Sequence, residues 1–152
     1  MVEKKKSILV VDDDKAILKY AKGILQLEGY DVDVAETGFD AMEKSSTHFY
    51  NLVLLDIMLP DIQGTELLTK MHRTTPKMMK IMVTGFPSFD NAVEALNMGA
   101  DAYLLKPVEL EELLRVVKEK LYEQEEAEKM SEEQVADWIN LRIQKLKANN
   151  DA

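Results

Sequence analysis

The stretch LVLLD, residues 52–56, is an uninterrupted apolar run that ends in a carboxylate. A short, continuous run of Leu and Val is typical of a strand that is buried on both faces of a sheet. An ionised side chain at the end of such a strand is costly unless another group compensates its charge. Asp56 is therefore the first candidate for a functional residue.

Four other apolar runs alternate with helical patterns along the chain. Strands are expected at residues 8–11, 31–35, 52–55, 79–83 and 102–105. Apolar residues at helical spacing predict five helices, which start near Asp14, Thr37, Gln63, Ser88 and Leu110. Gly29 and Gly99 lie where the first and fourth helices should end. This alternation predicts an α/β fold in which helices cover both faces of a parallel sheet.

Reactive side chains follow four of these five strands. Asp12 and Asp13 follow the first strand, Asp56 the third, Thr84 the fourth and Lys106 the fifth. The carboxyl ends of parallel strands meet at one edge of an open sheet, which is where such folds bind ligands. The sequence therefore predicts one site that contains all five residues.

These residue types suit metal-assisted phosphoryl chemistry. Clustered carboxylates repel one another unless a cation joins them, and Mg²⁺ binds one or two carboxylates together with phosphate oxygens. Asp56 would attack phosphorus to form an acyl phosphate, while Lys106 and the Thr84 hydroxyl stabilise charge on the transferring group. Taken singly, a threonine at a strand end is usually a turn residue and a lysine is usually solvated. Asp14 directly precedes a helical pattern and is interpreted as an N-cap rather than a ligand.

Length and composition fit one globular domain with an appendage. The 152 residues are 46% apolar and 31% charged, which is an ordinary balance for a folded protein. The absence of cysteine excludes disulfides and thiolate metal sites and fits a reducing compartment. A net charge of -9 argues against broad binding to nucleic acids or anionic membranes. No apolar stretch is long enough for a membrane span, and the basic start lacks the apolar region of a secretory signal.

The segment after residue 122 carries a different pattern. Residues 123–129 lose the apolar stripe and become acidic, as in a solvated extension of the fifth helix or a linker. The capping box SEEQ, residues 131–134, predicts the start of a separate amphipathic helix. The apolar face of this helix must be covered by its own domain, by a second copy or by another protein. That face comprises Val135, Trp138, Ile139, Ile143 and Leu146. The segment is too short for a winged-helix or helix-turn-helix module, so no DNA-binding output domain is expected.

Residues 6–121 closely resemble the receiver domain of two-component response regulators, in both the order and the spacing of the strand-end residues. The resemblance implies a flavodoxin-like, doubly wound (βα)5 domain with strand order 2-1-3-4-5 in residues 1–122. Residues 123–152 would add the acidic helical extension or linker and the amphipathic C-terminal helix. A protein of this kind is a cytoplasmic phosphoacceptor that assists its own phosphorylation and dephosphorylation, and it is not classed as an enzyme.

The resemblance also implies partners for this chain. A sensor histidine kinase or a phosphotransfer protein would donate the phosphoryl group, and an unidentified output protein would read the change. A homodimer would form through the fourth helix, fifth strand and fifth helix, or through the C-terminal helix. Neither nucleic acid nor membrane is expected as a partner.

The resemblance assigns roles to the acidic residues of the site. Asp56 would be the phosphoacceptor and Mg²⁺ the cofactor. Asp13 and Asp56 would bind the ion directly, and Asp12 more readily through water. The backbone carbonyl of Met58 would be the remaining protein ligand.

The same resemblance assigns the switch. Thr84 and Tyr103 would be the switch hydroxyl and the switch aromatic, and Lys106 would bind the phosphate. The Lys106-Pro107 peptide bond is expected to be cis, which is inexpensive for a bond that precedes proline.

Two other classes of function stay open at this point. Asp12, Asp14, Thr84 and Lys106 also resemble scattered motifs of haloacid-dehalogenase-type phosphatases, in which Asp12 would be the nucleophile. The short chain and the missing paired acidic motif after Lys106 weigh against that class. The third class is an interaction module that works without phosphorylation.

Two positions bear on how long a phosphorylated state would last. Met58 lies two residues after the acceptor, and Phe86 lies two residues after Thr84. Apolar bulk at both positions is predicted to flank the path of the hydrolytic water and slow dephosphorylation. Ordinary variation within the family explains the two residues equally well.

Overall fold

The computed structural model describes residues 4–71, 77–85 and 88–150 of the chain. Five parallel strands form one sheet in the order β2-β1-β3-β4-β5. Their bounds are Ser7–Val11 for β1, Asp31–Ala35 for β2, Leu52–Asp56 for β3, Met79–Thr84 for β4 and Ala102–Leu105 for β5. This confirms the predicted α/β class and strand order.

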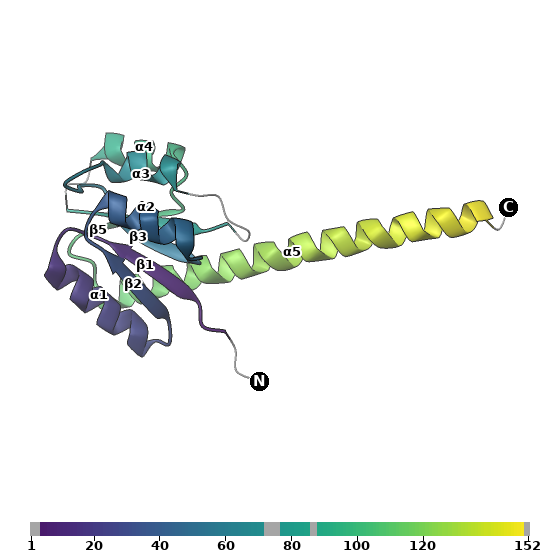
Figure 1. Cartoon of the computed structure of the whole chain (residues 1–152), viewed down its shortest axis with the longest axis horizontal. Helices are drawn as coiled ribbons and strands as arrows, with labels where there is room; N and C mark the ends of the chain where they lie inside the picture. The colour runs from purple at the N-terminus through teal and green to yellow at the C-terminus, as the bar shows by residue number, and fades with distance from the viewer. Residues whose placement is uncertain (1–3, 72–76, 86–87, 151–152) are drawn as a thin grey trace.

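Helices cover both faces of this sheet (Figure 1). Their bounds are Lys15–Leu27 for α1, Gly38–Thr47 for α2, Gly64–Lys70 for α3, Phe89–Asn97 for α4 and Leu110–Asn150 for α5. Successive residues of a strand point to opposite faces, so Ile8 packs in the core with α1 and α5, while Leu9 packs in the core with α2, α3 and α4. The continuous apolar strands are thus explained by burial on both sides.

Capping explains where several helices start and stop. The Asp14 side chain accepts hydrogen bonds from the first turn of α1, and Thr37 does the same for α2. Gly29 and Gly99 have positive φ angles of 95° and 101° directly after α1 and α4, a conformation that favours glycine. The N-cap role predicted for Asp14 is confirmed.

Strands β3 and β4 each extend one residue further than predicted. Asp56 and Thr84 are the last residues of their strands and still pair in the sheet, Asp56 with Val83 and Thr84 with Leu105. The backbones of both residues are therefore held within the sheet, at the carboxyl ends of its strands.

The prediction of a new helix at Ser131 is wrong. Helix α5 runs unbroken for 41 residues, and Ser131 lies inside it. A capping box acts only where the preceding backbone is not helical, because inside a helix the N–H groups already bond to carbonyls one turn back. Residues 110–150 contain neither Gly nor Pro, so nothing interrupts the helix. Despite its length, α5 is too polar to span a bilayer, and no helix in the described ranges is both long and apolar enough to do so.

The tail does not fold back on its own domain. Figure 1 shows α5 leaving the body as a single rod that carries the C-terminus far from the sheet. The last buried residue of α5 is Gln124, two positions beyond the predicted end of the receiver domain at residue 122. The division at residue 122 itself stays a prediction.

Gln124 anchors the exit of α5 through buried hydrogen bonds. Its side-chain amide donates to the backbone carbonyls of Asn51 at 2.9 Å and Lys77 at 2.7 Å. It also accepts from the Asn51 side chain at 3.0 Å, and Asn51 in turn accepts from the Ser7 backbone N–H. This network joins α5 to the amino ends of the strands, at the opposite edge of the sheet from Asp56.

Candidate functional site

The carboxyl ends of the strands bring the predicted acidic residues together. Asp12, Asp13 and Asp56 each present a carboxylate oxygen, and these oxygens lie within 4.8 Å of one another. Asp12 and Asp56 are buried, whereas Asp13 is exposed. The three residues line a cleft of about 230 Å³ together with Lys106, Met58 and Gly85. The cleft is small, open and strongly acidic.

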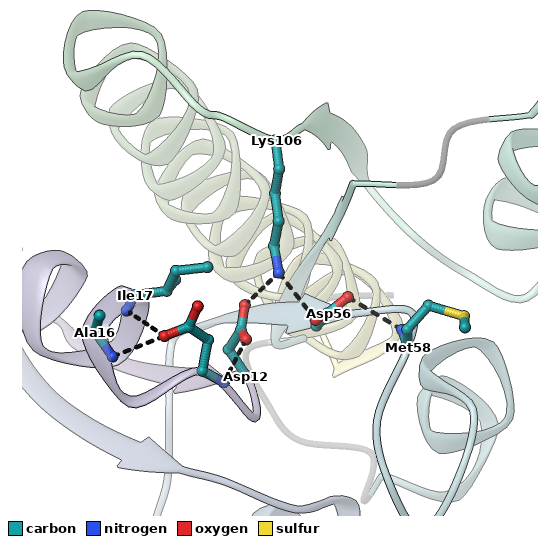
Figure 2. Close-up of polar contacts among 7 residues, drawn as sticks. Asp12, Ala16, Ile17, Asp56, Met58 and Lys106 are labelled. Atoms are coloured by element: carbon teal, nitrogen blue, oxygen red, sulfur yellow. Dashed lines mark hydrogen bonds and ion pairs between the residues drawn. The ribbon is translucent and has the colours of Figure 1, made fainter.

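Lys106 extends across the sheet edge and bridges two of these carboxylates (Figure 2). Its Nζ lies 2.6 Å from Oδ2 of Asp12 and 2.9 Å from Oδ2 of Asp56. Burial alone would lower the pKa of Lys106, but the bonds to the two carboxylates outweigh burial and raise its pKa above the usual lysine value. The lysine is therefore held fully charged beside Asp56.

One ammonium group does not balance the acidic cluster. Burial raises the pKa of Asp12 above its ordinary value, even though Lys106 and the Asp14 backbone N–H both act to lower it. The three carboxylates of the cluster and one lysine leave a formal charge of about -2. The donor set of oxygens and the excess negative charge both fit a hard divalent cation such as Mg²⁺.

Asp14 stands apart from this cluster. Its Oδ1 accepts from the backbone N–H groups of Ala16 at 2.9 Å and Ile17 at 3.4 Å, at the start of α1. Its own N–H donates to Oδ1 of Asp12 at 2.9 Å. Asp14 thus orients Asp12 through its backbone, while its side chain belongs to the helix.

The loop after β3 is held by contacts that sequence reasoning missed. The Met58 N–H donates to Oδ1 of Asp56 at 3.0 Å, which fixes the carboxylate from the side opposite Lys106. The Gly64 N–H donates to the Ile57 carbonyl at 2.7 Å. A Cβ atom at Gly64 would lie 2.3 Å from the Asp56 carbonyl oxygen, so only glycine allows this close approach.

Asp61 ties the same loop to a second element. Its two carboxylate oxygens accept from the N–H groups of Gly38 and Phe39, both at 2.9 Å, at the start of α2. Burial acts to raise the pKa of Asp61, but these bonds, together with backbone N–H groups of its own loop, outweigh burial and lower the pKa. The partners are more than twenty positions away in the sequence, so no local pattern could have revealed the contact.

The predicted switch residues lie on the neighbouring strands. Thr84 is fully buried at the end of β4, and its carbonyl accepts from the Lys106 N–H at 2.8 Å. The Lys106-Pro107 peptide bond is cis. Tyr103 packs against the core on the α2, α3 and α4 face, and its buried hydroxyl has no hydrogen-bond partner among the described residues. Both side chains are therefore turned inward.

The two positions assigned to signal lifetime have different outcomes. Met58 lines the acidic cleft, and its side chain is exposed. Phe86 lies outside the described residues. The effect on dephosphorylation stays a prediction for both.

Comparisons with known proteins agree on one family. The model of the response regulator receiver domain matches residues 8–118. The structure is similar to a crystal structure of a CheY-like receiver domain protein from Methanospirillum hungatei JF-1, with 53% identity and a TM-score of 0.78. That match covers 82% of this chain and 99% of the other.

Two curated bacterial proteins give the same result. An uncharacterized transcriptional regulatory protein, YkoG, from Bacillus subtilis and the response regulator ArlR from Staphylococcus aureus are each 36% identical over 107 residues, or 70% of this chain. The matched region makes up 47% and 48% of those proteins, so the chain matches about half the length of these relatives. The fold, the acidic cleft and the family match together show that the chain belongs to the response regulator receiver domain family.

Proposed function

We propose that this receiver domain accepts a phosphoryl group from a histidine kinase or a phosphotransfer protein on Asp56. The observation that carries the proposal is the setting of the Asp56 carboxylate. Lys106 holds one oxygen at 2.9 Å, the Met58 N–H holds the other at 3.0 Å, and Asp12 and Asp13 complete an acidic cluster beside it. The proposed donor places this activity in the cytoplasm.

The residues of the cluster fit Mg²⁺ as the cofactor. The carboxylates of Asp12, Asp13 and Asp56 and the backbone carbonyl of Met58 would hold the ion. The excess negative charge and the raised pKa of Asp12, which burial causes, both favour an added cation. When bound, Mg²⁺ would neutralise charge on the phosphoryl oxygens and so assist their approach to the carboxylates.

In the proposed reaction, a carboxylate oxygen of Asp56 attacks phosphorus while the P–N bond of a phosphohistidine breaks. The electron pair of that bond stays on the imidazole nitrogen. This nitrogen takes up a proton from water when the ring would otherwise leave as an anion. The Lys106 ammonium is already beside Asp56, so it can donate to a phosphoryl oxygen without a large movement. The buried Thr84 hydroxyl would donate to another phosphoryl oxygen.

The output of the reaction is proposed to be a change of shape rather than a chemical product. When Thr84 turns toward the phosphoryl group it would vacate space beside Tyr103 and so hold Tyr103 in the inward position that it already has in this structure. The exposed apolar residues of α4 and β5, among them Val93, Leu96 and Leu105, offer a surface on which a partner can read the change.

The test is labelling with a small phosphodonor such as phosphoramidate, followed by intact-mass measurement and peptide mapping. We expect one phosphoryl group on Asp56 in the presence of Mg²⁺ and none in Asp56→Asn. The matched control Asp31→Asn, an exposed carboxylate on β2, should be modified like the wild type. Phosphate on Asp12 would support a phosphatase of the haloacid dehalogenase type instead. No modification under any condition would leave the interaction module as the function.

A further inference from the structure

The part of α5 beyond Gln124 is a helix with a large uncovered apolar surface. Seven large apolar side chains between residues 130 and 146 are 45% to 61% exposed. They are Met130, Val135, Trp138, Ile139, Leu141, Ile143 and Leu146. A soluble chain rarely leaves such a concentration of apolar side chains in contact with water.

The centre of this surface is in register with the buried side of the same helix. Eighteen residues make five turns of an α-helix, so positions eighteen apart face the same direction. Val117 and Leu121 are buried against the sheet, and Val135 and Ile139 lie five turns further along. We call the line formed by Val135, Trp138, Ile139, Ile143 and Leu146 the tail stripe. The tail stripe continues the core-facing side of α5 after the domain has ended.

Charges divide the projecting helix into two halves of opposite sign. Residues 125–133 contain five glutamates and one lysine, a net charge of -4. Residues 134–150 contain one aspartate, two lysines and one arginine, a net charge of +2. Two such helices side by side in parallel would place like charges together, whereas an antiparallel pair would place each acidic half beside a basic half.

We infer that the projecting helix binds a second copy of this chain, with the two tail stripes packed together in antiparallel orientation. An overlap centred near residue 137 places Val135 opposite Ile139 of the other copy, and Glu132 opposite Arg142. Arg142 already lies over the Trp138 ring within one helix, at 5.7 Å, so the largest side chain of the tail stripe and the arginine beside it are partly ordered before pairing. Charge complementarity of this kind selects orientation as well as partner.

The shape of the molecule accommodates this pairing. The 26 residues from 125 to 150 extend about 39 Å at 1.5 Å per residue. Antiparallel rods of that length hold the two globular bodies at opposite ends, as the projection of α5 in Figure 1 indicates. Because α5 leaves from the amino ends of the strands, both Asp56 clefts stay open.

The first test is sedimentation equilibrium of the unphosphorylated chain over a wide concentration range, which keeps it independent of the function proposed for Asp56. We expect a monomer–dimer equilibrium that weakens as salt is added. Val135→Ser with Ile139→Ser should raise the dissociation constant about tenfold or more. The control pair Asn140→Ser with Gln144→Ser, on the opposite side of the helix, should leave it unchanged. A helical chain that stays monomeric at every concentration overturns the inference.

The second test determines orientation and uses the absence of native cysteine. Chains with Glu132→Cys and chains with Arg142→Cys are mixed and mildly oxidised. Antiparallel pairing predicts disulfides between the two variants, because position 132 of one copy lies opposite position 142 of the other. Disulfides that instead join position 132 to position 132 show a parallel pair and overturn the inference.

Discussion

Lys106 controls the electrostatics of the cleft through a single ammonium group. It bonds to carboxylates from two different strands and keeps its proton because both carboxylates stabilise the charge. Yet burial still raises the pKa of Asp12, so the lysine does not remove the need for another cation. Lys106 therefore neutralises only part of the negative charge of the carboxylates, and the site can bind a further charged ligand.

Gly64 is expected to position the acceptor through its lack of a side chain. In Gly64→Ala the new Cβ would meet the Asp56 carbonyl oxygen at 2.3 Å and the Ile57 Cα at 2.8 Å, so the backbone must move. We expect the free energy of unfolding to fall by about 1–3 kcal/mol and labelling of Asp56 to slow. Urea denaturation and phosphoramidate labelling measure the two effects.

The matched control for that substitution is Gly23→Ala in the middle of α1. Nothing lies within 4 Å of a Cβ atom there. Alanine favours the helix, so this variant should be more stable by about 0.5–1 kcal/mol. If both variants lose stability equally, the close approach at Gly64 is not the cause.

The raised pKa of Tyr50 predicts that the stability of the folded chain falls at alkaline pH. Its buried hydroxyl donates to Oδ2 of Asp33 at 2.6 Å, and burial followed by this bond raises its pKa above 10.0. The folded chain keeps this proton after the unfolded chain has lost it, so the stabilisation is present below pH 10 and is lost as the pH rises further.

The variant Tyr50→Phe separates this effect from the titration of the other tyrosines. Near pH 7 it should lose about 0.5–1.5 kcal/mol, the value of one hydrogen bond. Above pH 10 its stability should fall less steeply than that of the wild type, as measured by urea denaturation at a series of pH values. Equal slopes would contradict the assignment.

Helix α5 is a single continuous helix with a buried first part and an exposed last part. Its first part buries apolar residues against the sheet, and its last part is exposed on all sides among the described residues. Gln124 marks the transition, because its side chain donates to two backbone carbonyls that lie just before β3 and β4. The direction of the rod thus depends on polar contacts as well as on the core.

Gln124→Ala should destabilise α5 at the point where the helix leaves the globular domain. The change leaves the carbonyls of Asn51 and Lys77 without this donor, at a cost of about 1–3 kcal/mol in the free energy of unfolding. Hydrogen exchange should also become faster in the turns of α5 around residue 124. Glu125→Ala, one residue further on the exposed side, should change stability by less than about 0.5 kcal/mol. Similar losses in both variants would show that helix propensity, not the network, matters there.

Mg²⁺ should stabilise the whole domain, since a ligand that binds only the folded state adds to its free energy of unfolding. At a tenfold excess over the dissociation constant the gain is about 1.4 kcal/mol. The net charge of -9 means that any salt reduces repulsion, so the comparison is with NaCl at equal ionic strength. Thermal unfolding should show the extra gain with MgCl₂, its loss with EDTA and its reduction in Asp13→Asn. An equal effect of both salts would contradict binding at the cluster.

Most of the domain and its acidic cluster were predictable from local patterns. Continuous apolar runs and helical spacing located the strands and helices because burial on both faces of a parallel sheet imposes those patterns. The topology then required Asp12, Asp56 and Lys106 to meet, since each directly follows or ends a parallel strand.

The tertiary structure decided what depends on contacts between distant segments. The roles of Asp61, Gly64 and Gln124 arise from backbone groups that lie beside them only after folding. The prediction from the capping box at residues 131–134 was wrong for a related reason. The same residue pattern can start a helix or continue one, depending on whether the preceding backbone is already helical. Sequence alone determined the elements and the chemistry at the strand ends, because these follow from local periodicity and parallel pairing. The folded structure decided how Asp56 is held and where α5 points, because both depend on hydrogen bonds between residues that are far apart in the sequence.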